Sequence, residues 1–380
     1  MANAAGLLAM KVGIFMKVGM FMKVGIFMKN GKISENVYKR SILQQIKTKR
    51  EEVVSGAGLG GDCAIFSFHT GINYEACPPL FGQGIRGEKE DINDTNVTDK
   101  HVVISCVQEG SLPVTPILQR CVNIMAARDA ETVAAALSFL LPSDAEEDVL
   151  KKAMAEAEIF CGERRIQIAQ AQGRVTAAVK EALVTVTAYG RAAESVSYHT
   201  VTAAAPEQEI VISKWIGLEG TAILAGRHKE SLLARYPAWL IETAAGFDQY
   251  LSTIPEAAVA LKSNVCAMHN VSEGGIFAAL WELAEGAGVG LTIDLKKLPI
   301  RQETVEICNH CDVNPYELLS GGCLLMTSKD GDSLAGALEQ AGIPAVVVGK
   351  LTDSKERLIL NDGEVRYLDR PREDSIYKSA

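Results

Sequence analysis

The sequence has few basic residues for its acidic content and no dense run of them. Its 38 lysine and arginine residues are outnumbered by 47 aspartate and glutamate residues, which gives a net charge of −9. Binding to nucleic acids and to anionic membranes depends on basic patches, so we expect neither as a partner. Long hydrophobic runs are also missing near the N-terminus, where Lys11, Lys17 and Lys23 interrupt the apolar residues. This spacing argues against a transmembrane helix or signal peptide.

Paired cysteine motifs and histidine constellations are scarce as well. The nine cysteines are odd in number, scattered and mostly set in apolar stretches, a pattern typical of reduced, buried thiols in a cytoplasmic protein. Cys308 and Cys311 form a Cys-x-x-Cys motif, but no second pair accompanies it, so it is weak evidence for zinc. At a predicted helix end, packing and capping explain it better. No histidine pattern indicates a catalytic triad.

A length of 380 residues favours two domains over one. Residues 191–208 are rich in alanine, serine and threonine and contain Pro206, so we predict a linker there. It separates an N-terminal domain over residues 28–190 from a C-terminal domain over residues 209–375. Strand and helix patterns occur in both halves, which predicts two α/β (α+β) domains.

Residues 1–27 contain a hexapeptide repeat, Met-Lys-Val-Gly-Ile/Met-Phe, with three copies over residues 10–27. An even period would place alternate residues on opposite faces of a strand, and such a segment could add an edge strand to a sheet. The alternative is a disordered tail, or sequence upstream of a true start near Met22 or Met28. The pattern favours this second interpretation, since termini are often disordered.

Hydrophobic spacing in the first half predicts helices over residues 34–53 and 117–137, and strands over residues 63–68, 102–105 and 183–188. Ser143 and Glu146 form a capping-box pattern before another helix. That helix places four apolar residues on one stripe: Leu150, Met154, Ala157 and Cys161.

The second half repeats this rhythm. Strands are predicted over residues 210–213, 291–295 and 345–349, and a helix over residues 229–249 that breaks at Pro237. A further helix has a core face made of Ile276, Phe277, Leu280, Leu283 and Ala284. Asp332 is predicted to cap a last helix that ends at Gly342.

Residues 268–290, MHNVSEGGIFAALWELAEGAGVG, form the most distinctive stretch. Supporting motifs lie at residues 217–221 (GLEGT), 300–304 (IRQET) and 314–322 (NPYELLSGG). Together they resemble the C-terminal domain of the aminoimidazole ribonucleotide (AIR) synthase superfamily, and motifs in both halves extend the resemblance over about residues 28–375. Within that superfamily, the chain looks most similar to AIR synthase-related proteins near the hydrogenase-maturation branch.

The resemblance implies a two-domain AIR synthase-like fold. Its N-terminal sheet would pair across a dimer into a shared barrel, with the C-terminal domain alongside and nucleotide in the cleft at the dimer interface. The family's enzymes activate an oxygen or selenium atom by ATP-dependent phosphoryl transfer, with Mg²⁺ between phosphates and carboxylates. ATP and Mg²⁺ are therefore the cofactors that the resemblance implies.

Family site positions, however, are incompletely matched. The motif Gly60-Gly61-Asp62 is kept, and the resemblance assigns it to nucleotide binding, with Asp62 as a metal ligand. Where the family has acidic residues, this chain has Val107, Ile124 and Arg174. Magnesium prefers oxygen ligands, and phosphoryl transfer relies on charge neutralisation, so these losses would remove most of the mechanism. Arg174 either neutralises phosphate directly or reflects decay of the site.

The second-half motif is better kept, although Asn270 replaces the family's aspartate and Ser272 its threonine. With Gly274 and Gly275, these residues would open a helix whose free N–H groups form an anion site. The alternative is that they only cap and pack the helix, with Asn270 or Ser272 as N-cap.

The leading hypothesis is an AIR synthase-related protein with a degenerate Mg–ATP site. It would be a non-catalytic or impaired partner in a homodimer or in a heterodimer with an intact homologous subunit. One alternative is a divergent ATP-dependent synthase or kinase that uses Asp62, Arg174 and the turn at residues 272–275. Another is a binding module for small ligands. Carbamoyl dehydration is disfavoured because no cysteine lies near Ala380, and selenophosphate synthesis because none precedes Asp62.

Overall fold

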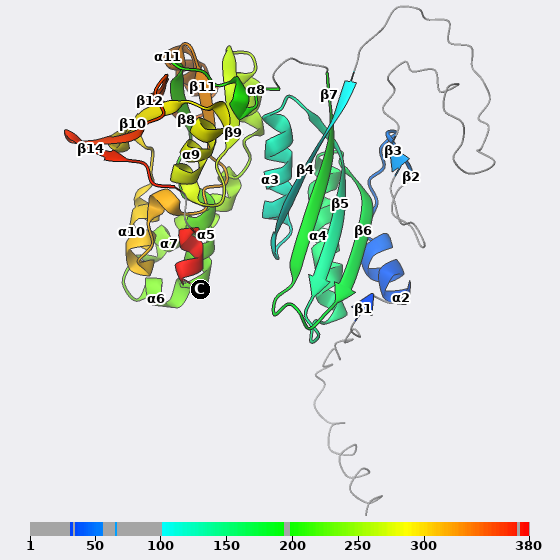
Figure 1. Cartoon of the computed structure of the whole chain (residues 1–380). Coiled ribbons are helices and arrows are strands. Elements are labelled where there is room, and N and C mark those ends of the chain that lie inside the picture. The colour runs from blue at the N-terminus through cyan, green and yellow to red at the C-terminus, as the bar shows by residue number, and fades with distance from the viewer. Residues whose placement is uncertain are drawn as a thin grey trace, which may run out of the picture.

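The protein is described by a computed structural model that covers residues 31–32, 35–55, 65–66, 101–193, 198–370 and 373–379. It has two α/β domains, each built on one main sheet (Figure 1). The hexapeptide repeat and the Gly60-Gly61-Asp62 motif lie outside the described residues. No helix within these ranges is long and apolar enough to cross a membrane.

The N-terminal domain contains a five-stranded sheet in the order β1-β6-β5-β7-β4. The strands β5 and β6 are parallel, and the other pairs are antiparallel. The strands are β1 (Gly31–Lys32), β4 (His101–Ser111), β5 (Glu131–Leu141), β6 (Gln167–Val175) and β7 (Leu183–Ala193). Helices α3 (Thr115–Ala126) and α4 (Glu147–Glu163) share one hydrophobic core with the sheet. A short pair, β2 (Val53–Ser55) and β3 (Ile65–Phe66), lies beside it.

The predicted helix over residues 117–137 is wrong in its second half. Helix α3 ends at Ala126, and after a turn with Asp129 at a φ of 53° the chain enters β5. The alanine-rich run of β5 has high helix propensity, but it pairs with β6 on one side and β7 on the other. Pairing on both edges and burial of Val133, Ala134 and Ala135 override that propensity.

The predicted capping box before α4 is also wrong. The N-cap is Glu146, which is extended and makes no side-chain capping bond. The first-turn residue Glu147 binds the Arg40 guanidinium and accepts a hydrogen bond from Ser41 Oγ at 2.7 Å. A carboxylate in the first turn still suits the helix dipole. The predicted apolar stripe of α4 is confirmed, and all four of its residues are buried.

The predicted helix over residues 34–53 is much shorter than expected. Helix α2 (Glu35–Tyr38) runs into one π-helical turn (Lys39–Leu43), and the chain is then extended. Glu158 of α4 holds this extended segment, because its Oε1 accepts from Lys47 N at 2.8 Å, Thr48 N at 2.5 Å and Thr48 Oγ1 at 2.7 Å. These contacts cross more than 100 residues of sequence, which helical periodicity cannot reveal.

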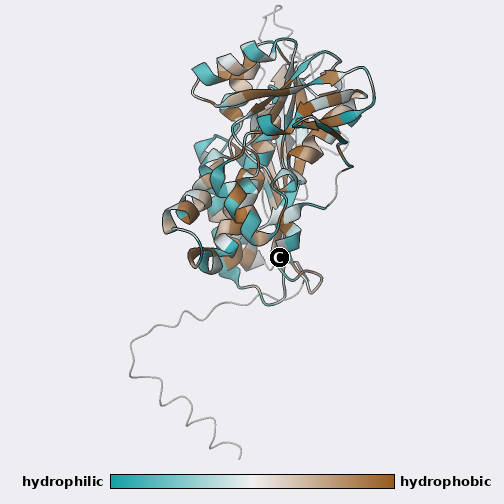
Figure 2. Cartoon of the chain, turned by 90° about the vertical axis from the view of Figure 1, so that its left-hand side faces the viewer, coloured by the Kyte–Doolittle hydropathy of each residue, from teal (hydrophilic) through white to brown (hydrophobic). Residues whose placement is uncertain are grey.

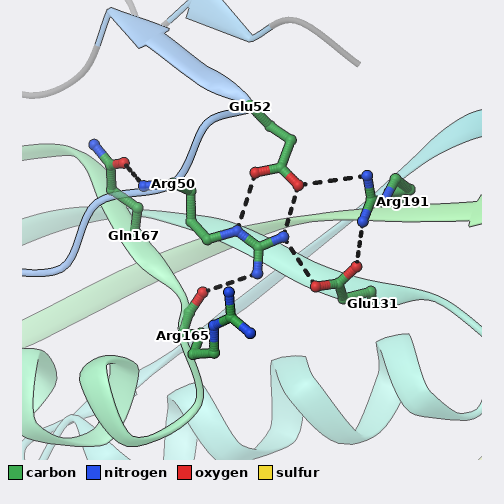
Figure 3. Close-up of polar contacts among 6 residues, drawn as sticks. All are labelled: Arg50, Glu52, Glu131, Arg165, Gln167 and Arg191. Carbon is green, nitrogen blue, oxygen red and sulfur yellow. Dashed lines mark hydrogen bonds and ion pairs between the residues drawn. The ribbon is translucent and has the colours of Figure 1, made fainter. Parts of the chain in front are cut away.

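Four charged side chains close a ring where this segment meets the sheet (Figure 3). Arg50 contacts Glu52 at 2.6 Å and Glu131 at 2.9 Å, and Arg191 contacts the same two carboxylates at 3.5 and 2.7 Å. Burial is greatest for Arg50 and Glu52, whose side chains are only 9% and 12% exposed. Their hydrogen bonds raise the pKa of Arg50 and lower the pKa of Glu52 to about 2.

The C-terminal domain contains a seven-stranded mixed sheet in the order β14-β13-β10-β12-β8-β11-β9. Its strands are β8 (Glu209–Ser213), β9 (Val265–Asn270), β10 (Gly290–Asp294), β11 (Leu324–Ser328), β12 (Ala345–Thr352), β13 (Arg357–Asn361) and β14 (Glu364–Tyr367). Its helices are α5 (Leu218–Arg227), α6 (Lys229–Leu233), α7 (Ala238–Ala245), α8 (Ile254–Ala260), α9 (Gly275–Ala287), α10 (Gln302–Cys311) and α11 (Gly331–Gln340). In Figure 2 the strands are mainly hydrophobic, whereas the helices carry both hydrophobic and hydrophilic residues.

Most predictions for this half are confirmed. The break at Pro237 separates α6 from α7, and the core face predicted for α9 is buried except for Phe277, which is half-buried. The cap of α11 is shifted: the N-cap is Asp330, whose Oδ1 accepts from Ser333 N at 3.0 Å, and not Asp332. The predicted stop is confirmed, since Gly342 follows with a φ of 78°.

Candidate functional site

The candidate site lies where α3 of the N-terminal domain contacts β9 and α8 of the C-terminal domain. Strand β9 ends at Asn270, a short loop follows, and α9 begins at Gly275. The segment of residues 251–253 runs between α3 and this loop. Asn123 of the N-terminal domain and Asn270 of the C-terminal domain therefore meet at one interface.

Asn123 and Asn270 are joined through Thr253. The buried Asn123 side chain donates from Nδ2 to Leu251 O at 2.7 Å, and its Oδ1 accepts from Thr253 N at 2.9 Å. Thr253 Oγ1 in turn donates to Asn270 Oδ1 at 2.9 Å. Both amide oxygens are thus used within the protein. Breaking this network would leave buried polar groups unpaired, which costs free energy.

Arg128 forms a second link between the domains just after α3. Its Nη1 donates to the carbonyl oxygens of Ala127 at 3.0 Å, His199 at 3.1 Å and Met268 at 2.8 Å. Burial lowers the pKa of this guanidinium. Its three carbonyl contacts explain why a long donor side chain stands at this turn.

The start of α9 is an anion site, but a side chain of this chain fills it. The N-cap is Gly274, with a φ of 77° and no side-chain cap, so the prediction of Asn270 or Ser272 as N-cap is wrong. Gly274 N donates to Asp374 Oδ2 at 2.6 Å, and Asp374 Oδ1 accepts from Leu319 N at 3.2 Å and Ile376 N at 2.8 Å. The carboxylate therefore lies where the helix dipole favours negative charge.

Asp374 could not be identified from the sequence, because 100 residues separate it from Gly274. It precedes a 3₁₀ turn (Ser375–Ser379) that packs against α5. Burial raises the pKa of Asp374, while its three backbone hydrogen bonds act in the opposite direction. The C-terminal segment is thus fastened to the loop that carries the predicted site.

Gly275 is required by packing. Its φ is 66°, and a Cβ atom there would lie 2.5 Å from Tyr316 O and 2.8 Å from Leu318 O. No side chain fits at that distance. Ser272 contributes its carbonyl, which accepts from Gly275 N and from Ser320 N, both at 3.1 Å. These contacts favour the structural explanation of the glycines and of Ser272.

A buried carboxylate lies close to this loop. Glu219, in the first turn of α5, is 4% exposed, and its Oε1 lies 3.6 Å from Arg120 Nη1 of α3. Its Oε2 has no hydrogen-bond partner among the described residues, and burial raises the pKa of the carboxyl group. A Cβ atom at Gly321 would lie 2.0 Å from this Oε2. The GLEGT motif therefore contributes an interdomain ion pair that the sequence did not predict.

The remaining predicted positions are not brought to this interface within one chain. Strand β4 alternates, so Cys106 contacts α3 whereas Val107 points to the open face and is 57% exposed. Arg174 is exposed, and its partner in the sheet, Leu140, also faces the open side. Three strand spacings separate β6 from β4, or about 14 Å. Val107 and Arg174 thus lie across the sheet from Asn123.

Metal-binding side chains are not grouped in the described part of the chain. No three histidine, cysteine, aspartate or glutamate residues there lie close enough together to hold a metal ion. Gly60, Gly61 and Asp62 lie outside this part. The seven described cysteines are free, and burial raises the pKa of Cys308 to about 12, which makes its thiol unreactive.

Comparison with known proteins finds a family match for the C-terminal domain. Residues 205–361 match the family described as AIR synthase related protein, C-terminal domain. Subunit PurL of phosphoribosylformylglycinamidine synthase from Corynebacterium aurimucosum is 36% identical over 95 residues, which are 24% of this chain and 11% of PurL. Carbamoyl dehydratase HypE from Rhodobacter capsulatus is 26% identical over 149 residues, 38% of this chain and 42% of HypE. The matches thus span less than two thirds of either relative.

Solved structures support the same fold for both domains. The hydrogenase maturation protein HypE from E. coli superposes with a TM-score of 0.62 at 17% identity, covering 74% of this chain and 89% of HypE. Thiamine-monophosphate kinase from Stenotrophomonas maltophilia gives a TM-score of 0.59 at 17% identity, covering 88% of this chain and 98% of the kinase. The two-domain AIR synthase-like fold predicted from the sequence is confirmed.

Proposed function

We propose that this chain, whose residues 205–361 form an AIR synthase related C-terminal domain, is a non-catalytic or impaired dimeric partner of an intact homologous subunit. The observation that carries the proposal is the use of the site's polar atoms. The amide oxygens of Asn123 and Asn270 both accept hydrogen bonds from Thr253, in the segment of residues 251–253. Asp374 fills the anion position at the start of α9.

With Asn270 in the place of the family's aspartate, these contacts make the position an interdomain contact rather than a place for charged ligands. An asparagine oxygen already bonded to Thr253 is a poor ligand for Mg²⁺, which prefers carboxylate and phosphate oxygens. A phosphate arriving at the helix start would have to displace the Asp374 carboxylate from three N–H groups. Both effects stabilise the protein without nucleotide, as a structural partner requires.

The open face of the N-terminal sheet supports a partner subunit. Val103, Val107, Leu140 and Leu183 are 53%, 57%, 37% and 38% exposed there. Strand β4 is an 11-residue edge strand, and long edge strands of this kind are usually covered. One solved neighbour of similar fold was crystallised as a HypE–HypF complex, so proteins of this fold assemble with other chains. Seven free thiols suit the cytoplasmic location that we also propose.

Calorimetry tests the proposal directly. ATP and Mg–ATP are titrated separately into the purified chain, and co-purifying proteins are identified by mass spectrometry. We expect no Mg²⁺-dependent ATP binding by the chain alone, and a heterodimer in which the homologous partner binds the nucleotide. Tight Mg²⁺-dependent ATP binding with measurable turnover by the chain alone would show the proposal to be wrong.

The dimer surface is tested separately by light scattering. Val107→Lys places a charge in the middle of the open face and should give monomers. Val365→Lys is the matched control, since Val365 is 60% exposed on β14 in the other domain, and it should leave the assembly unchanged. An assembly, with itself or with the homologous subunit, that Val107→Lys leaves intact would contradict the proposed dimer surface.

A second candidate is a divergent ATP-dependent phosphoryl-transfer enzyme acting on a small molecule. Solved neighbours named as HypE in complex with ATP and as a thiamine-monophosphate kinase with AMPPCP favour it. Asp62 and the exposed Arg174 would then contact the nucleotide from the open face. Arg174→Gln should weaken ATP binding if this candidate holds, whereas Arg227→Gln, at an exposed position on α5, should not. Equal binding by both variants would exclude that role for Arg174.

A further inference from the structure

The flank of α9 forms one wall of a cavity of about 230 Å³ in the C-terminal domain. Two loops and the last two strands of the sheet close its other sides. The cavity is lined by Gly274, Phe277, Ala278, Asn314, Glu317, Ile359 and residues 366–370. It shares Gly274 with the loop described above but lies on the side of β13 and β14, away from α3.

Two guanidinium groups, Arg366 and Arg370, give the cavity its positive charge. Among the described residues the Arg366 side chain makes no hydrogen bond or ion pair, and the Arg370 guanidinium lies 6.0 Å from the centroid of the Trp281 ring. Of the two acidic residues in the lining, Glu317 is 3.8 Å from Lys378, and Asp369 has a partner of its own. Two guanidinium groups whose side chains have no acidic partner among the described residues favour an anionic ligand.

The opposite wall is a fixed aromatic surface. Phe277 stacks on Tyr316 with ring centroids 5.1 Å apart and an interplanar angle of 12°. Asn314 Oδ1 accepts from Tyr316 N at 3.1 Å and so holds the turn that carries this ring. Ala278, Ile359 and Leu368 add apolar surface. A rigid ring beside apolar side chains suits a planar, aromatic group.

From these features we propose that the cavity binds a small ligand made of one aromatic or heteroaromatic ring with a phosphate group. Phosphate would lie between Arg366 and Arg370, and the ring would lie against Phe277. The volume is below the 300–1,000 Å³ typical of sites for drug-sized ligands, so a single ring fits better than a dinucleotide. This site is independent of nucleotide binding in the cleft and of dimerisation.

Calorimetry and ³¹P NMR on the full chain test the site with three probes: phenyl phosphate, inorganic phosphate and phenol. We expect phenyl phosphate to bind more tightly than either fragment, since only it engages both walls. Arg366→Gln and Arg370→Gln should each weaken phenyl phosphate about tenfold. Arg227→Gln, an exposed arginine on α5, should change nothing. Phe277→Leu should reduce the preference for phenyl phosphate over inorganic phosphate.

Two results would overturn the proposal. One is a Kd for phenyl phosphate no lower than that for inorganic phosphate. The other is equal binding by the Arg366→Gln and Arg227→Gln variants, which would assign any binding to another place such as the interdomain cleft. Circular dichroism of each variant separates loss of binding from loss of folding. A failure here leaves the proposed function untouched, because that proposal predicts no Mg²⁺-dependent ATP binding by the chain alone whether or not this cavity takes a ligand.

Discussion

Replacing Asp374 gives the sharpest test of the structure around α9. Its carboxylate accepts three backbone hydrogen bonds, of 2.6, 2.8 and 3.2 Å, and its side chain is buried. An unpaired buried N–H costs about 1–3 kcal/mol, so Asp374→Ala would cost several kcal/mol if nothing relaxed. Residues 373–379 end the described chain and can move away to admit water. We therefore expect a loss of about 3 kcal/mol in the free energy of unfolding.

Urea and thermal unfolding, followed by circular dichroism, measure this loss. Three kcal/mol corresponds to a fall in Tm of about 6–12 °C for a domain of this size. Asp374→Asn should show an intermediate loss, because an amide offers one oxygen and turns donors toward the remaining N–H groups. Asp353→Ala, at an exposed position, is the control. A change below about 0.5 kcal/mol for Asp374→Ala would refute the assignment of the carboxylate to the start of α9.

Three other substitutions test separate contacts. Asn123→Ala removes the link to Thr253 and should lower the free energy of unfolding by about 2–3 kcal/mol in urea titrations, and an unchanged midpoint would contradict the interdomain network. Burial raises the pKa of Glu219, so ionisation there destabilises the fold as pH rises above the ordinary carboxyl range. The free energy of unfolding of Glu219→Gln relative to the parent should therefore rise between pH 4 and pH 7, and parallel curves for the two proteins would refute this. Asp330→Ala should lower the free energy of unfolding by about 1 kcal/mol through loss of the N-cap, whereas Asp332→Ala should change it little. A larger loss for Asp332→Ala than for Asp330→Ala would show that Asp332 is the N-cap, as the sequence predicted.

The sequence predicted best where local pattern decides the structure. The core face of α9 and the break at Pro237 follow from spacing and from proline's missing N–H, and the structure confirms both. The AIR synthase-like fold was predicted from motifs in both halves, and the comparisons confirm it. These features depend on residues that are neighbours along the chain.

Prediction failed where distant partners decide. The alanine run in β5 looks helical until its pairing with β6 and β7 is known. The site role of Val107 and Arg174 stays a prediction; the alternation of β4 and the register of β6 put both on the open face of the sheet, which the sequence alone did not indicate. The role of Asp374 at the start of α9 could not be predicted, because two of its three partners lie 100 and 55 residues earlier in the chain.

The ring of Arg50, Glu52, Glu131 and Arg191 determines which residues a stably folded N-terminal domain must contain. Each arginine bridges both carboxylates, so the four charges are satisfied only as a set. A fragment that starts at His101 would keep strands β4 to β7 of the five-stranded sheet but only half of the ring. It would also lose Arg50 N, the donor to Gln167 Oε1 at the start of β6. The extended segment before β2 is thus integral to the N-terminal domain, and a stable fragment has to include it.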